Sequence, residues 1–492
     1  MTSEAITKSA ADLRCRPNLD DPGTAARLFT WATARARFPA LAGGRFNMAI
    51  EAVDRQVEAG RGAEIALRFV AADDRVSELT YGELARRTHA FARTLGSLQV
   101  NSGATVASWL PAEPAYAQAL LGTLEAGAVF CPLDPRSSPE TLAARLAVAE
   151  ARVLVTTRAR YRDVVRHVQN RLPSLQWILL SDGRAEDEGG LVRALPARLQ
   201  AAPTTAPDVV TGGQDVALLH FTRGTMGRAK AVLHVHEALV AHVWTARAAL
   251  DLHPDDVFCC TLDPTSALGL AYGFLAPLTL GVVSIIDEVG AVASAGSGGR
   301  LYALLQNQRV TVLLTNPEVI DRLRSTDWRL PQHYDLRRMR FIVSVGGGLP
   351  PSAIAWSQAF LGTPIHNQWG QAETGAILLA NLAATPVQPG CLGRPLPGVE
   401  AAIVRRTERG VEPLGAQAVE GELALRCGWP SMYRGFRGDP GRAEACLVDG
   451  WYLTGDRFRR DAAGDFWFVG RCPPGVKAPS VEPPTDRSPV PA

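Results

Sequence analysis

Short apolar runs alternate with amphipathic segments through the first part of the chain. The aliphatic runs predict strands at residues 65–70, 104–110, 128–133, 153–156 and 177–180. Apolar residues at helical spacing predict helices over 46–58, 79–95, 115–126 and 139–149. Strands that are apolar along their length and alternate with helices are typical of a parallel sheet covered on both faces.

The same alternation returns in the second part of the chain. Strands are predicted at 257–261, 282–286, 310–314 and 341–345, and helices over 301–306, 317–323 and 351–361. Between 393 and 470, short alternating strands and turns predict a small antiparallel barrel or sheet. The most apolar stretch, 268–286, contains Pro277 and three glycines, so we interpret it as a buried strand and loop rather than a membrane span.

A loop rich in glycine and threonine follows the apolar run at 216–219. It contains Thr222, Gly224, Thr225 and Gly227 and ends at Lys230. Glycines let backbone N–H groups approach an anion, hydroxyls donate to it and lysine neutralises its charge, so the loop is a candidate phosphate site. Its spacing is not that of a Walker A loop. A surface turn between two strands would give the same pattern.

Lysine is rare in this chain, which makes the one in the loop informative. The 51 basic residues include three lysines, Lys8, Lys230 and Lys477. The loop resembles the phosphate-binding signature T-S-G-T-T-G-x-P-K-G of the adenylate-forming (ANL) acyl-CoA synthetases, and its flanks resemble acetyl-CoA synthetases in particular. The positions that depart from the signature are Arg223, Met226, Ala229 and Ala231.

The resemblance extends from about residue 46 to residue 477. It implies the large N-terminal domain of that family, an α/β fold with two doubly wound parallel sheets and a small antiparallel β subdomain. We therefore expect a loose lead-in at 1–45, an AMP-binding domain at 46–471 and a disordered, proline-rich tail at 472–492. The family continues into a small C-terminal domain with a catalytic lysine, and we expect this chain to lack it.

A second motif, at residues 367–375, contains Trp369 and Glu373. In the family, the matching glutamate holds Mg²⁺ and the aromatic residue belongs to the nucleotide site, so the resemblance implies these roles here. The family threonine before the glutamate is Ala372 in this chain. Taken alone, Glu373 is more typical of an acid on a solvated loop.

The resemblance also implies an acyl pocket formed by Ala267, Leu268, Val345 and Gly370, with Gly346 beside the adenine. Acetyl-CoA synthetases carry, at the position of Gly370, a tryptophan that closes the pocket around acetate. An aromatic side chain of that kind buries about 150–250 Å². Its absence predicts an acid larger than acetate, medium-chain or aryl. Drift in a disused site would leave the same residues.

A third motif, at residues 451–456, ends at Asp456. A carboxylate can accept hydrogen bonds from both ribose hydroxyls, and Asp456 matches the ribose-binding aspartate of the family. Arg471 matches an arginine that contacts the phosphate, so the resemblance implies Lys230, Glu373 and Arg471 as the catalytic residues. In isolation Asp456 and Arg471 would be a turn acid and a surface arginine.

The leading hypothesis is an AMP-forming acyl-CoA synthetase, an acid–thiol ligase. A carboxylate would attack the α-phosphate of ATP with Mg²⁺ as cofactor, and CoA, or else a carrier protein, would then take the acyl group. The alternative is a catalytically impaired pseudoenzyme that binds nucleotide or acyl-adenylate, which Ala372 and the prolines after Arg471 favour. A third possibility is a separate chain that supplies the C-terminal domain.

Composition and motif content bear on other classes of function, namely nucleic-acid binding, metal binding, secretion and hydrolysis. The net charge is +2, and no basic run with interleaved aromatics indicates nucleic-acid binding. The eight cysteines lack metal-ligand spacing and the N-terminus lacks an apolar signal region, which predicts a cytoplasmic protein without a membrane span. Without a G-x-S-x-G elbow, we interpret His234, His236 and His242 as core or surface histidines.

Overall fold

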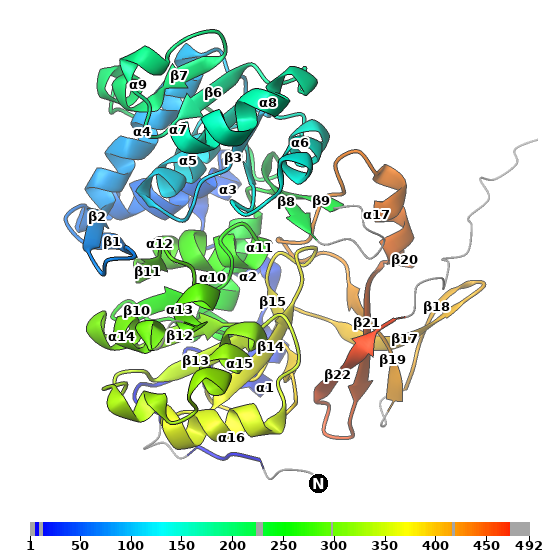
Figure 1. Ribbon diagram of the computed structural model, residues 1–492. Coiled ribbons are helices and arrows are strands. Elements are labelled where there is room, and N and C mark those ends of the chain that lie inside the picture. The colour runs from blue at the N-terminus through cyan, green and yellow to red at the C-terminus, as the bar shows by residue number, and fades with distance from the viewer. Residues whose placement is uncertain (1–4, 9–12, 223–229, 297–298, 416–418, 473–492) are drawn as a thin grey trace, which may run out of the picture.

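The computed structural model describes residues 5–8, 13–222, 230–296, 299–415 and 419–472. In this part of the chain, two α/β sheets lie one above the other and a smaller antiparallel sheet projects to one side (Figure 1). The predicted fold class is therefore confirmed. The tail predicted at 472–492 lies outside the described residues apart from Cys472, and so do Gly224, Thr225 and Gly227.

The first sheet has the strand order β7-β6-β5-β3-β4-β8-β9. Its neighbours pair in parallel except β8 and β9, which are antiparallel. Every residue of the central strands is buried, as strands covered on both faces require. The bounds are β3 Thr105–Ser108, β4 Val129–Pro132, β5 Val153–Thr156, β6 Trp177–Leu180, β7 Val192–Ala194, β8 Val216–Thr222 and β9 Lys230–Val235.

The second sheet has the order β16-β15-β14-β13-β12-β10-β11-β1-β2. The strands from β14 to β1 are parallel, and β2, β15 and β16 pair antiparallel at the edges. The bounds are β1 Ile65–Val70, β2 Val76–Thr80, β10 Val257–Cys260, β11 Val283–Asp287, β12 Val312–Thr315, β13 Phe341–Val345, β14 Ile365–Gly370, β15 Ile377–Ala380 and β16 Arg394–Pro395.

The third sheet is antiparallel throughout and runs in the order β18-β17-β19-β21-β20, with β22 also paired to β21. It is an open sheet, which settles the choice between barrel and sheet left by the sequence. The bounds are β17 Ala401–Thr407, β18 Gly410–Pro413, β19 Val419–Arg426, β20 Leu447–Val448, β21 Trp451–Arg460 and β22 Phe466–Arg471.

Helices cover the two parallel-rich sheets and the largest core cluster lies where the sheets meet. That cluster joins Phe91 and Leu120 of the first layer to Leu239 and Phe274 of the second. The α-helices are α1 Pro22–Leu28, α2 Trp31–Arg35, α3 Pro39–Ala42, α4 Tyr81–Ser97, α5 Pro114–Glu125, α6 Pro139–Val148, α7 Arg158–Arg160, α8 Arg166–Val168, α9 Leu195–Ala201, α10 Ala238–Ala248, α11 Ala267–Leu270, α12 Ala276–Leu280, α13 Ala291–Gly296, α14 Arg300–Asn307, α15 Pro317–Thr326, α16 Pro351–Phe360 and α17 Pro440–Cys446.

The helix predicted from residue 79 shows why these segments fold as they do. The Thr80 hydroxyl accepts from the Glu83 N–H at 3.2 Å, and the Glu83 carboxylate accepts from the Thr80 N–H at 3.0 Å. This capping box satisfies two backbone groups at the start of α4. The buried face of α4 then packs on α5.

The interpretation of 268–286 as a strand and loop was wrong over most of its length. Residues 267–280 are helical, as α11, a π-helical turn at Ala271–Leu275 and α12, and only β11 is a strand. Pro277 lies inside this continuous helical run, directly after the π-helical turn, and the Gly273 carbonyl that its missing N–H would bond accepts from the Ser284 hydroxyl at 2.8 Å instead. In the described residues, no helix has both the length and the apolar character needed to cross a membrane.

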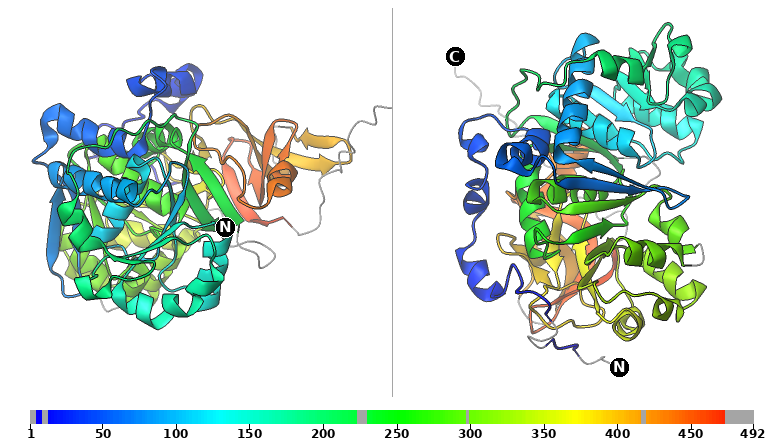
Figure 2. Two further views of the ribbon diagram at one scale, coloured as in Figure 1. Left: turned by 90° about the horizontal axis from the view of Figure 1, so that it is seen from above. Right: turned by 90° about the vertical axis from the view of Figure 1, so that its left-hand side faces the viewer.

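The N-terminal lead-in is more regular than the expected loose segment. It forms α1, α2 and α3, and Ala34 and Phe38 are buried in the main core. The Trp31 indole N–H also donates to the carbonyl of Gly398 at 2.8 Å. Figure 2 shows this segment running along one side of the molecule.

Candidate functional site

Strand ends of the two parallel-rich sheets contribute residues to the candidate site. Val345 ends β13 and Gly370 ends β14, so both lie at the carboxyl edge of parallel strands, where ligands of open α/β sheets bind. Thr222, the last residue of β8, pairs directly with Lys230, the first of β9. The two ends of the predicted phosphate loop are thereby held together. Residues 223–229 lie outside the described part.

Lys230 and Glu373 form an ion pair across 143 positions of sequence. The Lys230 Nζ lies 3.0 Å from the Glu373 Oε1, and both side chains are largely buried, with 18% and 11% exposed. The Lys230 ammonium also lies 5.6 Å from the centre of the Phe436 ring. Glu373 is therefore not the solvated loop acid that the residue alone suggested.

Asp456 is held on both of its oxygens. Its Oδ2 accepts from the Trp369 indole N–H at 3.0 Å and from the Gln371 amide at 2.7 Å. Its Oδ1 pairs with the Arg471 guanidinium at 2.7 Å. Burial raises the pKa of Asp456, and Arg471 and the two donors oppose that shift. The Asp456 side chain is nearly inaccessible, whereas 64% of Arg471 is exposed.

Gln371, which was not singled out from the sequence, binds Asp456 and belongs to the same turn as Glu373. Its amide binds Asp456, its Oε1 accepts from the Tyr452 hydroxyl at 2.8 Å, and it lies two residues before Glu373. Its place between Trp369 and Glu373 in one motif was the available signal. The Glu373 charge also acts on the pKa of Asp456, so the pair Lys230–Glu373 lies near the group of Trp369, Asp456 and Arg471, and all five are predicted site residues.

Hydrogen bonds to its backbone carbonyls hold the turn that carries Glu373. His234 Nε2 lies 2.8 Å from the Ala372 carbonyl oxygen, and the Tyr433 N–H donates to the Glu373 carbonyl at 3.1 Å. Trp429 and Ser431 both donate to the carbonyl of Thr374. Burial lowers the pKa of His234 to about 4, so the ring is neutral and donates from Nε2. A neutral histidine can hold this turn without repelling Lys230.

The histidines after the loop are core residues, as one of the two interpretations had it. His234, His236 and His242 are all buried. Burial lowers the pKa of His236 to about 4 and that of His242 to about 3. His236 Nδ1 accepts from the backbone N–H of Met48 at 3.1 Å, which ties the loop region to the N-terminal part of the fold.

The predicted acyl-pocket residues adjoin the site. Leu268 and Val345 are buried in one apolar cluster with Tyr272 and Ile377, and Ala267 is buried as well. Gly346 follows Val345 with φ +105°, and a Cβ there would meet nothing within 4 Å, which leaves room for a ligand against the backbone.

The lack of a tryptophan side chain at Gly370 suggested empty space beside this residue, but the structure does not leave that space open. A Cβ built on Gly370 would lie 2.6 Å from the Ala376 carbonyl oxygen. The pairing of β14 and β15 shifts register between Trp369 and Gly370, which brings the backbone of Ala376 against this position. Backbone therefore fills the direction that a side chain at this position would take.

Comparisons with known proteins agree with this geometry. A family model described as AMP-binding enzyme matches residues 53–436. The acetyl-coenzyme A synthetase of Bacillus subtilis is 33% identical over 90% of this chain and 76% of that protein. That of Methanothrix thermoacetophila is 31% identical over 87% of this chain and 68% of that protein.

Two solved structures are also similar. The crystal structure of a Brucella canis acyl-CoA synthetase matches with a TM-score of 0.81 and 28% identity, over 92% of this chain and 80% of that one. An anthranilate CoA ligase in complex with anthranoyl-AMP shares the fold, with a TM-score of 0.78 and 20% identity over 87% and 78% of the two chains.

Proposed function

This chain belongs to the AMP-binding enzymes, as an AMP-forming acid–thiol ligase of the acyl-CoA synthetase type, and we propose that it activates a carboxylic acid larger than acetate as acyl-adenylate before transfer to CoA. The observation that carries the proposal is the proximity of two ion pairs, Lys230–Glu373 and Asp456–Arg471. Gln371 donates to Asp456 and belongs to the same turn as Glu373, and the Glu373 charge acts on Asp456, so the groups proposed for phosphate, metal and ribose would face one site.

Lys230 and Thr222 are proposed to bind the nucleotide phosphates. They are register partners at the two ends of the loop, so an ammonium and a hydroxyl stand together at its base. In the free protein the Lys230 charge is balanced by Glu373. When nucleotide binds, the phosphate oxygens would replace Glu373 as the ion-pair partner of Lys230, and the Glu373 carboxylate would be free to bind a cation.

Glu373 fits a Mg²⁺ site that relies on the nucleotide. It is an oxygen donor, and in the described residues it belongs to no cluster of three metal-ligating side chains. Mg²⁺ is commonly held by one or two carboxylates together with substrate phosphates, so a lone glutamate suffices. The ion would neutralise charge on the phosphate oxygens as pyrophosphate leaves.

Asp456 is arranged to accept ribose hydroxyls from one side. Trp369 and Gln371 fix its Oδ2, and the remaining partner, Arg471, is mostly exposed. Ribose can therefore displace Arg471 from Asp456 without unpairing a buried group. Arg471 would then be free to contact the phosphate of the adenylate, the second role proposed for it.

The preference for an acid larger than acetate rests on small side chains at the pocket. No aromatic ring extends from Gly370, and Ala267 offers only a methyl group. Leu268 and Val345 give the apolar wall that an alkyl or aryl group needs. The packing of Ala376 on Gly370 limits the space on one side, so length along the Leu268–Val345 wall is the proposed direction of extension.

A screen of pyrophosphate release from ATP tests the proposal. The panel compares acetate with medium-chain and arylacrylic acids, with and without Mg²⁺. We expect release with a larger acid, and a loss of at least about 100-fold in Glu373→Gln, as removal of one preorganised electrostatic group commonly causes. Release with no acid of the panel would reject ligase activity by this chain, and acetate as the best substrate would reject the size preference.

The second candidate function is nucleotide binding without turnover. Ala372 replaces the family threonine beside Glu373 and removes one donor to the adenylate phosphate. Titration calorimetry with AMP separates the two candidates, because binding without pyrophosphate release would support this one. The comparisons give no support to a separate chain that supplies a C-terminal domain, and that idea stays a hypothesis.

A further inference from the structure

Three metal-ligating side chains meet where α4 and α5 pack on the π-helical turn Ile50–Asp54. Asp54 ends that turn, His89 lies in the middle of α4 and Glu125 is the last residue of α5. The two helices pack against each other, and α4 also contacts the turn (Figure 1). One ligand atom from each of the three residues lies within 4.8 Å of the other two. None of the three belongs to a motif assigned to the nucleotide.

The His89 ring stands between two carboxylates. Its Nδ1 lies 2.7 Å from the Glu125 Oε1, and its Nε2 lies 3.4 Å from the Asp54 Oδ1. The exposed fraction of the side chain is 11% for His89, 18% for Asp54 and 1% for Glu125. Val53 and Leu124, the residues that precede the two acids, belong to the main apolar core. Both carboxylates are therefore largely removed from water, where an opposite charge attracts them more strongly.

The second oxygen of Glu125 is the observation that points to a further ligand. Glu125 Oε2 is buried and, among the residues that the structure describes, accepts no hydrogen bond. In the same part of the chain, His89 is the only ion-pair partner of Asp54. A buried carboxylate oxygen without a donor is costly, because it has given up its hydration for nothing in return. A cation between the two acids would remove that cost.

The strongest neighbouring charges cancel one another. Arg55 is shared between Glu51, at 3.4 Å, and Glu58, at 2.6 Å, so that trio carries one net negative charge. Arg93 adds one positive charge and donates to two backbone carbonyls. The two carboxylates of the cluster, beside a neutral imidazole, then leave two negative charges, which a divalent cation matches. One of them ends α5, and the partial negative charge of a helix C-terminus also favours a cation.

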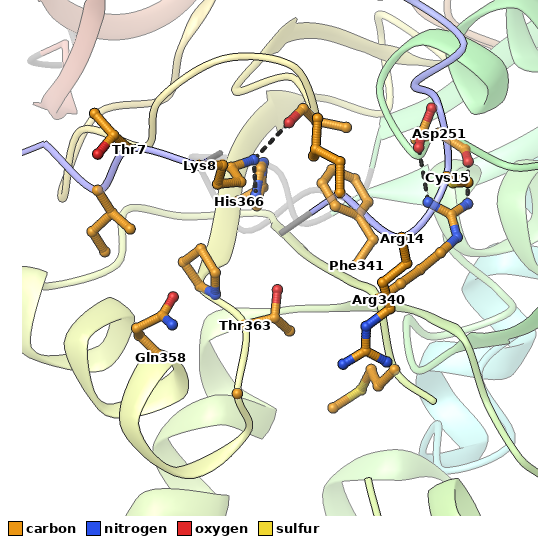
Figure 3. Close-up of a pocket in the computed structure, with 16 residues that line it drawn as sticks. Thr7, Lys8, Arg14, Cys15, Asp251, Arg340, Phe341, Gln358, Thr363 and His366 are labelled. Atoms are coloured by element: carbon orange, nitrogen blue, oxygen red, sulfur yellow. Dashed lines mark hydrogen bonds and ion pairs between the residues drawn. The ribbon is translucent and has the colours of Figure 1, made fainter. Parts of the chain in front are cut away.

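A second group of three ligating side chains, Cys15, Asp251 and His253, shows the contrast. Its ligand atoms also lie within 4.8 Å of one another. Both Asp251 oxygens are engaged, however, because Oδ1 accepts from the Asn18 N–H at 2.7 Å and Oδ2 pairs with the Arg340 guanidinium at 2.8 Å (Figure 3). A cation there would have to displace an arginine from its carboxylate.

We propose that Asp54, Glu125 and one imidazole nitrogen of His89 bind a zinc-type divalent cation, with water in the remaining position. Imidazole suits zinc and similar transition metals, whereas Mg²⁺ prefers oxygen ligands. Zinc lies about 2.0–2.2 Å from such ligands, so two of them are at most about 4.4 Å apart. The present spacing closes to that value with a shift of less than about 1 Å. The ion would tie the N-terminal part of the fold to α4 and α5.

Titration of the full-length chain with Zn²⁺, without nucleotide, tests the proposal. The protein is treated with EDTA and dialysed, and competition with a chromophoric chelator then gives the number of bound ions and the Kd. We expect one ion at this site and a Kd at least about 10-fold higher in Asp54→Asn and His89→Gln, since loss of even an outer-shell partner costs about 10–100-fold. Glu58→Gln is the matched control, because it removes a nearby charge that is exposed and screened, and its Kd should stay within about threefold of the wild type.

Cobalt and thermal unfolding identify the ligands. Bound Co²⁺ should show the visible absorption of a nitrogen and oxygen site, without the charge-transfer band of a thiolate ligand, and Cys15→Ser should leave its spectrum unchanged. Zn²⁺ should raise the melting temperature of the wild type but not that of Asp54→Asn, which decides the matter if His89→Gln does not fold. No saturable Zn²⁺ binding, an unchanged Kd in Asp54→Asn, equally tight binding of Mg²⁺, or a thiolate band that Cys15→Ser removes would each overturn the proposal.

Discussion

The change of Asp456 to asparagine separates its part in stability from its part in binding. The isosteric amide can turn its oxygen toward Trp369 and Gln371 and keep both hydrogen bonds, but without the charge. A bond to a charged group contributes about 1.5–3 kcal/mol and a neutral one about 0.5–1.5 kcal/mol, so the two bonds together lose about 2 kcal/mol. Because burial raises the pKa of Asp456, removal of the charge also relieves a desolvation cost. The free energy of unfolding should therefore fall by less than about 2 kcal/mol.

Nucleotide binding should suffer more than stability in Asp456→Asn. The new NH₂ group faces the side where Arg471 now lies and where ribose is proposed to bind. Loss of at least one charge-assisted bond to a ribose hydroxyl, about 1.5–3 kcal/mol, corresponds to a Kd for AMP about 10–100 times higher. Titration calorimetry with AMP and urea unfolding of the same preparations give the two quantities.

Asp461 supplies a matched control. Its Oδ2 accepts from the Trp467 indole N–H at 2.8 Å, much as Asp456 accepts from Trp369, but no predicted site residue contacts it. Asp461→Asn should lower stability by a similar small amount and leave AMP binding unchanged. If Asp456→Asn binds AMP within about threefold of the wild type, or if Asp461→Asn weakens binding equally, ribose recognition by Asp456 is refuted.

Three further predictions concern the stability of the fold. Thr80→Ala removes the N-cap of α4 and should lower the free energy of unfolding by about 0.5–2 kcal/mol in urea titrations. Gly370→Ala forces a Cβ against the Ala376 carbonyl and should cost about 1–3 kcal/mol, so a melting temperature equal to that of the wild type would contradict the packing described. Burial and Glu125 raise the pKa of Asp54 from 3.8 to about 7. The contribution of Asp54 to the free energy of unfolding is therefore complete below about pH 4 and is lost as the pH rises toward 7. Asp54→Asn should flatten the plot of unfolding free energy against pH between these values, and an unchanged slope would exclude Asp54 as its source.

The sequence determined the regular elements wherever local signals agreed. The strands at 177–180 and 341–345 have the predicted bounds, because each is a short apolar run between polar residues. The failure at 267–280 has an identifiable cause. Proline and glycines in an apolar run suggest a break, but here the Ser284 hydroxyl bonds the Gly273 carbonyl that Pro277 leaves unpaired, so the helix continues.

The sequence also determined which side chains could handle a nucleotide, through residue type and motif. Lys230, Glu373, Asp456 and Arg471 were each singled out, and each had an ordinary surface role as an alternative. Tertiary structure decided between these interpretations. Only packing brings Lys230 to Glu373 and buries Asp456, since these contacts join positions distant in the chain.

What sequence could not supply was the shape of the backbone around the site. The absence of a side chain at Gly370 indicated space, but the register shift between β14 and β15 fills that direction with the Ala376 carbonyl. The contact of Gln371 with Asp456 likewise joins segments that meet only after folding. Residue types follow from the sequence, whereas distances, burial and the room left for a ligand are set by long-range packing, because no local pattern encodes which strand edges come together.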